Sequence, residues 1–175
     1  TAYLPIRFTV TVSGKQPMSY RIEEKKAMRF VGIRFPLTQN MEENQNMVPF
    51  FWDKLLKNGQ INSLYNLTDE PLGIAGITHS LNNQFYYSVA AASSKAVPMG
   101  MNVLEIPAAV WVVFECDGLF KEASQAIFRR FLTEWLPFSG YAYAELPDIE
   151  IYPINHDMSE SGHFEIWIAI KKVKN

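Results

Sequence analysis

The stretch SGHFEIWIAI, residues 161–170, decides the fold class of this chain. One side of the stretch is apolar at every position: Phe164, Ile166, Ile168 and Ile170. The other side carries Glu165, Trp167 and Ala169. Alternation with a period of two predicts a β-strand. Because the second side is also largely apolar, both faces of the strand are expected to be covered, and a carboxylate in such surroundings needs a partner.

The composition places the chain among folded globular domains. Its 175 residues are 48% hydrophobic and carry a net charge of −2, which supplies a core for one domain and no electrostatic basis for nucleic-acid binding by this segment. Cys116 is the only cysteine, so neither a disulfide framework nor a thiolate metal cage is expected. The chain has no signal-like start and no apolar run near 18 residues, so we expect a cytoplasmic protein without a membrane partner.

Two segments of the chain share one order of elements: strand, helix, strand, strand. Repeat one, about residues 18–95, has a helix expected over 46–59 and a hairpin of 72–80 with 84–93. Repeat two, about residues 100–173, has a strand over 102–118, a helix over 119–136 and a hairpin of 148–156 with 163–172. The order predicts an α+β fold, a duplicated β-α-β-β module with pseudo-two-fold symmetry, a mainly antiparallel sheet and two principal helices. Residues 1–17 are expected to form an extended linker, the junction between the domain at 18–175 and a further N-terminal region outside this segment.

No catalytic or metal-binding motif stands out. The histidines are His79, His156 and His163, and none has a helical partner four residues away or a nearby cysteine, so we expect no metal site and no cofactor. The sequence also lacks a phosphate-binding loop and a nucleophile elbow.

The remaining chemical signal is Glu165 among aromatic residues. Its partner is either an internal base, such as Arg7, Arg29 or Arg34, or a cationic ligand held by aromatic rings.

The ordered set of segments resembles one known family. MSYRIEEKKAMRFVGIRF, WDKL, FYYSVAA, LEIPAAVWVVFECDG, EWLPFSGY, DIEIYPI and HFEIWIAI together resemble the GyrI-like small-molecule-binding domain, also called the bacterial transcription activator effector-binding domain. The resemblance spans residues 18–173. It implies a duplicated β-α-β-β fold that binds aromatic, cationic small molecules, multidrug ligands among them, in a central cleft. It also implies the sensing part of an AraC-family regulator, which would contact DNA only through an N-terminal domain outside this segment.

The resemblance also implies the site residues. The glutamate of the family's last strand maps to Glu165, with Trp167 on the same strand face. The tyrosine of the first hairpin maps to Tyr87, whereas comparison of the two repeats favours Tyr86. The aromatic residue in IPAAVW maps to Trp111, and Trp52, on the first helix, is either pocket wall or core. Ala169 stands where family members usually have proline, which leaves the fine shape of the pocket open. No catalytic residue is assigned.

Two other functions remain open at this stage. Some GyrI-like proteins resemble hydrolases of reactive genotoxins, and a carboxylate in an apolar pocket could act as a general base or acid. A protein-binding module is the third alternative, and a large exposed apolar patch without a cavity would favour it. The sensor function is favoured over these two alternatives because the opening residues look like the junction after a DNA-binding region.

Overall fold

The structure is a computed structural model that describes residues 6–10, 17–69, 73–154 and 161–174, with side chains from residue 17 onward. The strands are β1 (Ile6–Val10), β2 (Met18–Lys25), β3 (Met28–Pro36), β4 (Ile74–Leu81), β5 (Gln84–Ala92), β6 (Asn102–Ile106), β7 (Ala109–Leu119), β8 (Tyr141–Tyr143), β9 (Asp148–Tyr152) and β10 (Ser161–Lys172). The helices are α1 (Met41–Lys57), α2 (Gln60–Leu67), α3 (Phe120–Arg130), the π-helical turn η1 (Phe131–Trp135) and α4 (Leu136–Ser139). No helix in these ranges is long and apolar enough to cross a lipid bilayer.

The strand order confirms the predicted duplicated α+β fold. The ten-stranded sheet runs β1-β2-β7-β10-β9-β4-β5-β3-β6, with β8 on β10, and the pairs described are all antiparallel. The order β7-β10-β9 in one half mirrors β3-β5-β4 in the other, so a pseudo-two-fold axis passes between β4 and β9. In that central ladder Gly76 pairs with Glu150.

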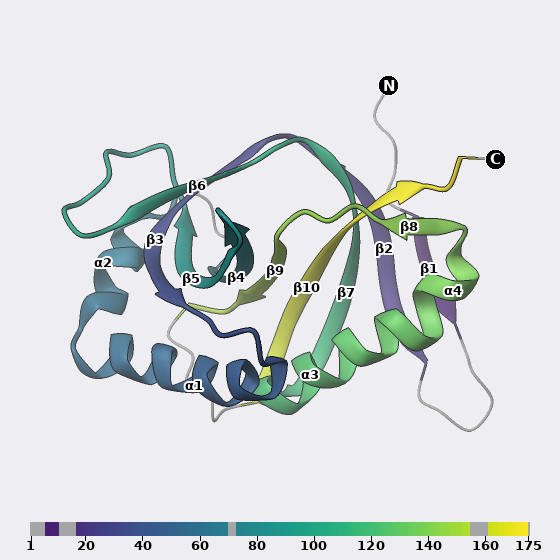
Figure 1. Cartoon of the computed structure of the whole chain (residues 1–175), viewed down its shortest axis with the longest axis horizontal. Helices are drawn as coiled ribbons and strands as arrows, with labels where there is room; N and C mark the ends of the chain where they lie inside the picture. The colour runs from purple at the N-terminus through teal and green to yellow at the C-terminus, as the bar shows by residue number, and fades with distance from the viewer. Residues whose placement is uncertain (1–5, 11–16, 70–72, 155–160, 175) are drawn as a thin grey trace.

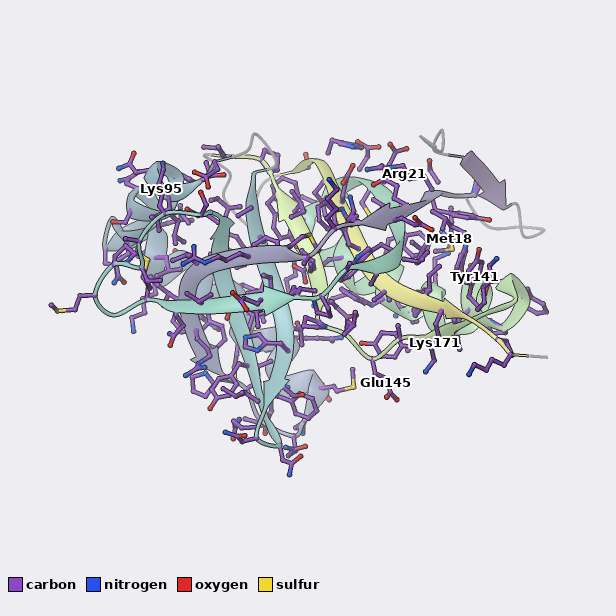
Figure 2. The ribbon with its side chains drawn as sticks, turned by 90° about the horizontal axis from the view of Figure 1, so that it is seen from above. Met18, Arg21, Lys95, Tyr141, Glu145 and Lys171 are labelled. Carbon is purple, nitrogen blue, oxygen red and sulfur yellow. The ribbon has the colours of Figure 1, made fainter. Side chains whose placement is uncertain are left out.

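Two long segments close one face of the sheet. β2 runs into β3 and β6 into β7, and the two segments pair along their lengths, from Tyr20 with Phe114 to Gly32 with Asn102. This bent ribbon arches over one face of the central strands, while α1 and α3 lie against the other face (Figure 1). Figure 2, viewed from above, shows the ribbon crossing the remaining strands.

Both faces of the central sheet are therefore buried, as the opening stretch predicted. Phe164, Ile166, Ile168 and Ile170 pack in the core under the helices. Trp167 and Ala169 pack in a second core beneath the ribbon.

The first helix differs from the expected 46–59. Helix α1 begins at Met41, because the Asn40 side chain accepts hydrogen bonds from the backbone N–H groups of Glu42 and Glu43 and so caps the first turn. Pro49 consequently lies inside the helix rather than in its first turn. The expected stop at Gly59 is confirmed by its left-handed φ of 78°, but a second helix, α2, follows at once.

The second helix also differs at both ends. Asp117 does not cap it, because Asp117 belongs to β7 and pairs with His163 of β10, and the N-cap residue is Leu119. The helical segment continues past Pro137 through η1 and α4 to Ser139. It ends at Gly140, whose φ of 76° is readily adopted by glycine.

Candidate ligand-binding site

A cleft of about 620 Å³ lies between α1 and α3, over the central strands of the sheet. This volume falls within the range of small-molecule sites, about 300–1,000 Å³. Much of its wall is apolar: Leu37, Val48, Pro49, Phe128, Phe131 and Ile168. Three further lining residues are large, apolar and exposed to solvent: Met41, Phe85 and Leu132. An apolar ligand could therefore contact the cleft wall from the surface inward.

Glu150 lies at the floor of the cleft, held by tyrosine hydroxyls. The residue is 8% exposed and comes from the middle of β9. Its Oε2 accepts hydrogen bonds from the hydroxyl of Tyr152 at 2.6 Å and from that of Tyr87 at 3.3 Å. Trp52 of α1 in turn donates from Nε1 to the Tyr87 hydroxyl at 3.0 Å. Helix α1 and the two strands β5 and β9 thus share one buried polar network.

A glycine makes this network possible. Gly76 of β4 lies between Tyr87 on β5 and Glu150 on β9, its partner across the central ladder. A Cβ atom at position 76 would overlap the Tyr87 hydroxyl and lie 2.7 Å from its Cζ atom. The absence of a side chain therefore lets the Tyr87 ring reach across β4 to the carboxyl group.

Burial raises the pKa values of both carboxyl groups in the cleft. The pKa of Glu150 is raised from 4.5 to about 7, chiefly by desolvation. The hydrogen bonds from Tyr152 and Tyr87 lower this pKa, and the nearby Asp148 carboxylate raises it further. Desolvation likewise raises the pKa of Asp148 from 3.8 to about 6, against a lowering by its hydrogen bond from Tyr143. The Tyr143 hydroxyl donates to Asp148 Oδ1 at 3.1 Å.

Neither carboxyl group has a cationic partner among the described residues. The contacts of Glu150 are tyrosine hydroxyls, and that of Asp148 is Tyr143. Lys121 and Arg129 of α3 also line the cleft, but neither forms an ion pair with these carboxyl groups within the described ranges. A buried carboxyl group, Glu150, and a half-buried one, Asp148, are costly to ionise without a counter-ion, so the pair favours a cationic guest.

Two of the residues predicted for the site belong to this network. Tyr87 lines the cleft, whereas Tyr86, the alternative to it, points to the opposite face of β5. There Tyr86 stacks on His79 and lies under the guanidinium of Arg34. Trp52 is fully buried and supports Tyr87 from behind.

The other predicted residues lie on the ribbon face, away from this cleft. Trp111 and Trp167 belong to the second core, and Trp111 Nε1 is buried without a hydrogen-bond partner in the described part of the chain. Glu165 lies on the same face of β10 as Trp167, because the two residues are two positions apart on one strand. Ile168 lies on the other face, where it lines the cleft.

The partner of Glu165 is internal. Arg21 of β2 donates from Nη2 to Glu165 Oε1 at 2.9 Å, and Trp167 donates from Nε1 to Oε2 at 2.8 Å. The ammonium of Lys25 lies 4.0 Å from the centroid of the Trp167 ring. Sequence reasoning considered Arg7, Arg29 and Arg34 for this role. It did not consider Arg21, which reaches β10 across β7.

Sequence reasoning missed Glu150 and Asp148. The signal was present in DIEIY, residues 148–152, where Asp148, Glu150 and Tyr152 alternate with two isoleucines. Three polar groups on one face of a strand that is otherwise apolar would have indicated a polar site beneath the helices.

Comparisons with known proteins identify the family of the chain. Residues 21–170 match the family described as Cass2, integron-associated effector binding protein. No curated protein matches the chain.

Solved structures share the fold. A structure of SAV2435 bound to tetraphenylphosphonium has a TM-score of 0.75 at 21% identity, covering 87% of this chain and 93% of that one. A putative bacterial transcription regulation protein from Staphylococcus aureus MU50 has a TM-score of 0.72 at 21% identity, covering 88% and 99%. EcmrR, in a complex with DNA, has a TM-score of 0.57 at 17% identity, covering 89% of this chain but 58% of the longer EcmrR chain.

Proposed function

This chain belongs to the Cass2 family of integron-associated effector binding proteins, and from that premise we propose that it senses a hydrophobic, aromatic cation in the cleft between α1 and α3. The resemblance to GyrI-like effector-binding domains is thereby confirmed at the level of family and fold. The observation that carries the proposal is the pair of carboxyl groups that face an apolar cleft without a counter-ion among the described residues: the buried Glu150 and the half-buried Asp148.

The shape of the cleft selects the size and polarity of the ligand. Its volume of about 620 Å³ suits a drug-sized molecule, and its apolar walls favour a ligand with a large hydrophobic body. Tyr87 and Tyr143 add aromatic faces beside the carboxyl groups, and aromatic rings attract organic cations through their quadrupoles.

Electrostatics select the charge of the ligand. A cation beside Glu150 and Asp148 supports their ionised forms and so lowers pKa values that burial has raised. Cation binding is consequently coupled to proton release near neutral pH. A neutral ligand of the same shape would gain nothing from ionisation and would bind less tightly above pH 7.

The sensor would act in a transcription regulator by population shift. The cleft lies across the junction of the two repeats, so a ligand that contacts both α1 and α3 favours one arrangement of the halves over others. EcmrR, a structural relative solved with DNA, supports a regulatory role of this kind.

Calorimetric titration with tetraphenylphosphonium tests the proposal. We expect wild type to bind one equivalent at pH 8, and Glu150→Gln to weaken binding at least about tenfold, or about 1.4 kcal/mol. Glu165→Gln is the matched control, because it makes the same chemical change on the opposite face of the sheet. If Glu165→Gln abolishes binding and Glu150→Gln does not, the ligand site lies under the ribbon and the proposal is wrong.

Hydrolysis of a bound ligand is the second candidate. A carboxyl group whose pKa is about 7 is suited to accept a proton from water at neutral pH. Mass spectrometry of reactive electrophiles incubated with the protein would detect the addition of one water molecule. Turnover by wild type and its loss in Glu150→Gln would favour the enzyme over the sensor.

A further inference from the structure

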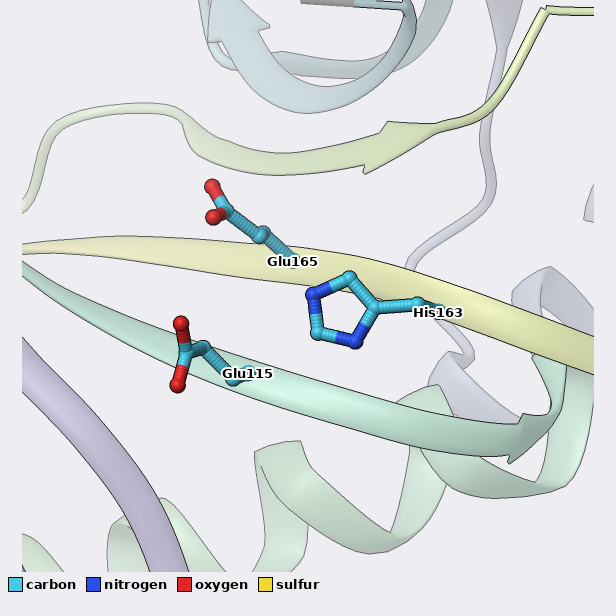
Figure 3. Close-up of side chains that lie close together, drawn as sticks. All are labelled: Glu115, His163 and Glu165. Atoms are coloured by element: carbon cyan, nitrogen blue, oxygen red, sulfur yellow. The ribbon is translucent and has the colours of Figure 1, made fainter.

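A second polar cluster lies on the ribbon face of the sheet, separate from the cleft. Glu165 and Glu115 face each other directly across the β10–β7 ladder, and His163 lies two residues before Glu165 on β10. One ligating atom from each of these three side chains lies within 4.8 Å of the others. Figure 3 shows the imidazole and the two carboxylates converging on one point.

The orientation of His163 suits a metal ligand. Its Nδ1 lies 3.1 Å from Asp117 Oδ1, so Nε2 is the ring nitrogen that faces the two glutamates (Figure 3). A carboxylate that holds one imidazole nitrogen fixes the ring and raises the basicity of the other nitrogen, which is the usual arrangement of metal-bound histidine.

Arg21 links the two glutamates of this cluster. Like charges directly opposite in a ladder are destabilising, and Arg21 offsets this repulsion by donating to both Glu115 and Glu165, at 3.3 and 2.9 Å. Each carboxylate oxygen offers two lone pairs, so these bonds leave acceptor positions to which a metal ion can bind.

We propose that Glu115, His163 and Glu165 form a binding site for a divalent transition-metal ion, with zinc as its best fit. One imidazole and two carboxylates match the donor preference of zinc. Ligands of tetrahedral zinc lie roughly 3.3 Å apart, so the ligating atoms, which lie within 4.8 Å of one another, need to close by at most about 1.5 Å. A carboxylate offers about four lone-pair positions, so both glutamates can keep Arg21 while they bind the metal.

The expectation of no metal site rested only on the lack of histidine partners four residues away on a helix and of a nearby cysteine. It overlooked strand spacing, in which positions 163 and 165 share a face, and the ladder that brings position 115 beside them. The zinc site is independent of the proposed organic-cation cleft, which lies on the other face of the sheet.

The test is a zinc titration of the intact chain in competition with a chromophoric chelator. We expect one saturable site in wild type, weakened at least about 100-fold in His163→Asn and in Glu165→Gln. Asp117→Asn is expected to weaken binding about 10- to 100-fold, as loss of a supporting carboxylate does elsewhere. Arg21→Gln should tighten binding, because it removes a positive charge that would repel the bound cation.

Matched controls separate this site from background zinc binding. Asp53→Asn, at a carboxylate paired with Lys57 on α1, should bind zinc within about twofold of wild type. Glu150→Gln should also leave zinc binding unchanged. Absence of a saturable one-to-one site, or equal zinc affinity in wild type and His163→Asn, overturns the proposal, provided circular dichroism shows each variant to be folded.

Discussion

Replacing Glu150 with glutamine should make the free protein more stable at alkaline pH. Burial raises the pKa of Glu150 from 4.5 to about 7, so the folded chain binds this proton more tightly than the unfolded chain does. The stabilising effect of that proton is complete below pH 4.5 and is lost as the pH rises through 7. At 1.36 kcal/mol per pH unit, ionisation of Glu150 costs the folded state about 3 kcal/mol at pH 8.

The glutamine variant avoids this cost because it carries no charge at any pH. Its carbonyl oxygen can still accept from the hydroxyls of Tyr152 and Tyr87. We therefore expect the stability difference, Glu150→Gln minus wild type, to rise from near zero at pH 4.5 to about 3 kcal/mol at pH 8.

Urea denaturation of both proteins between pH 4.5 and pH 8 measures this difference. Comparing the pair removes groups that titrate independently of Glu150, notably His79, whose pKa burial lowers to about 4. Asp148, whose pKa burial raises to about 6, interacts with Glu150 and so contributes to the measured difference. A difference that stays flat across the range, or a variant less stable than wild type at pH 8, would refute the reasoning about Glu150. Added tetraphenylphosphonium at a hundredfold excess over its Kd should restore about 2.7 kcal/mol to wild type at pH 8.

Three further substitutions test the packing around the two sites. Gly76→Ala should cost about 1–3 kcal/mol in urea denaturation and weaken organic-cation binding, because the new methyl group displaces Tyr87; unchanged affinity would show that Tyr87 does not shape the cleft. Trp52→Phe should lower the free energy of unfolding by about 2 kcal/mol in urea denaturation, because it removes a hydrogen bond and leaves a small cavity. A loss below about 0.5 kcal/mol would argue against the buried network. Arg21→Met should cost about 1–2 kcal/mol, because it leaves Glu115 and Glu165 opposed, and adding Glu115→Gln should recover most of that loss; no recovery would mean that Arg21 acts through packing alone.

The repeated order of elements was readable from local patterns. Alternation in DIEIY and HFEIWIAI predicted the second hairpin, and the two asparagines at 82 and 83 adopt the positive φ angles of a tight turn. Helix ends were less predictable. Asn40 and Asn46 are both plausible caps by sequence. Asn40 is the cap in the structure, where it exchanges hydrogen bonds with Thr38, and Thr38 in turn bonds to Asn44 in the first turn of α1.

The candidate site was predictable only in part. Tyr87 and Trp52 were identified, and both join the network at the cleft floor. Glu165 drew attention as a carboxylate among apolar residues, yet Arg21 partners it. Glu150 likewise lies among apolar residues of its strand, but it has no cationic partner in the described ranges. Sequence spacing could not separate the two, because the partner comes from a strand far away in the chain.

The sequence by itself determined the fold class, the duplication and which residues share a strand face, since these follow from local periodicity of two or 3.6 residues. Only the tertiary structure decided which face of each strand lies under the helices and which lies under the ribbon. Both faces of the central sheet are covered, one by helices and one by the ribbon, so alternation marks two buried sides without distinguishing them. The helices leave a cleft on one side, and Glu150 faces that cleft, whereas the packing of the ribbon brings Arg21 to Glu165.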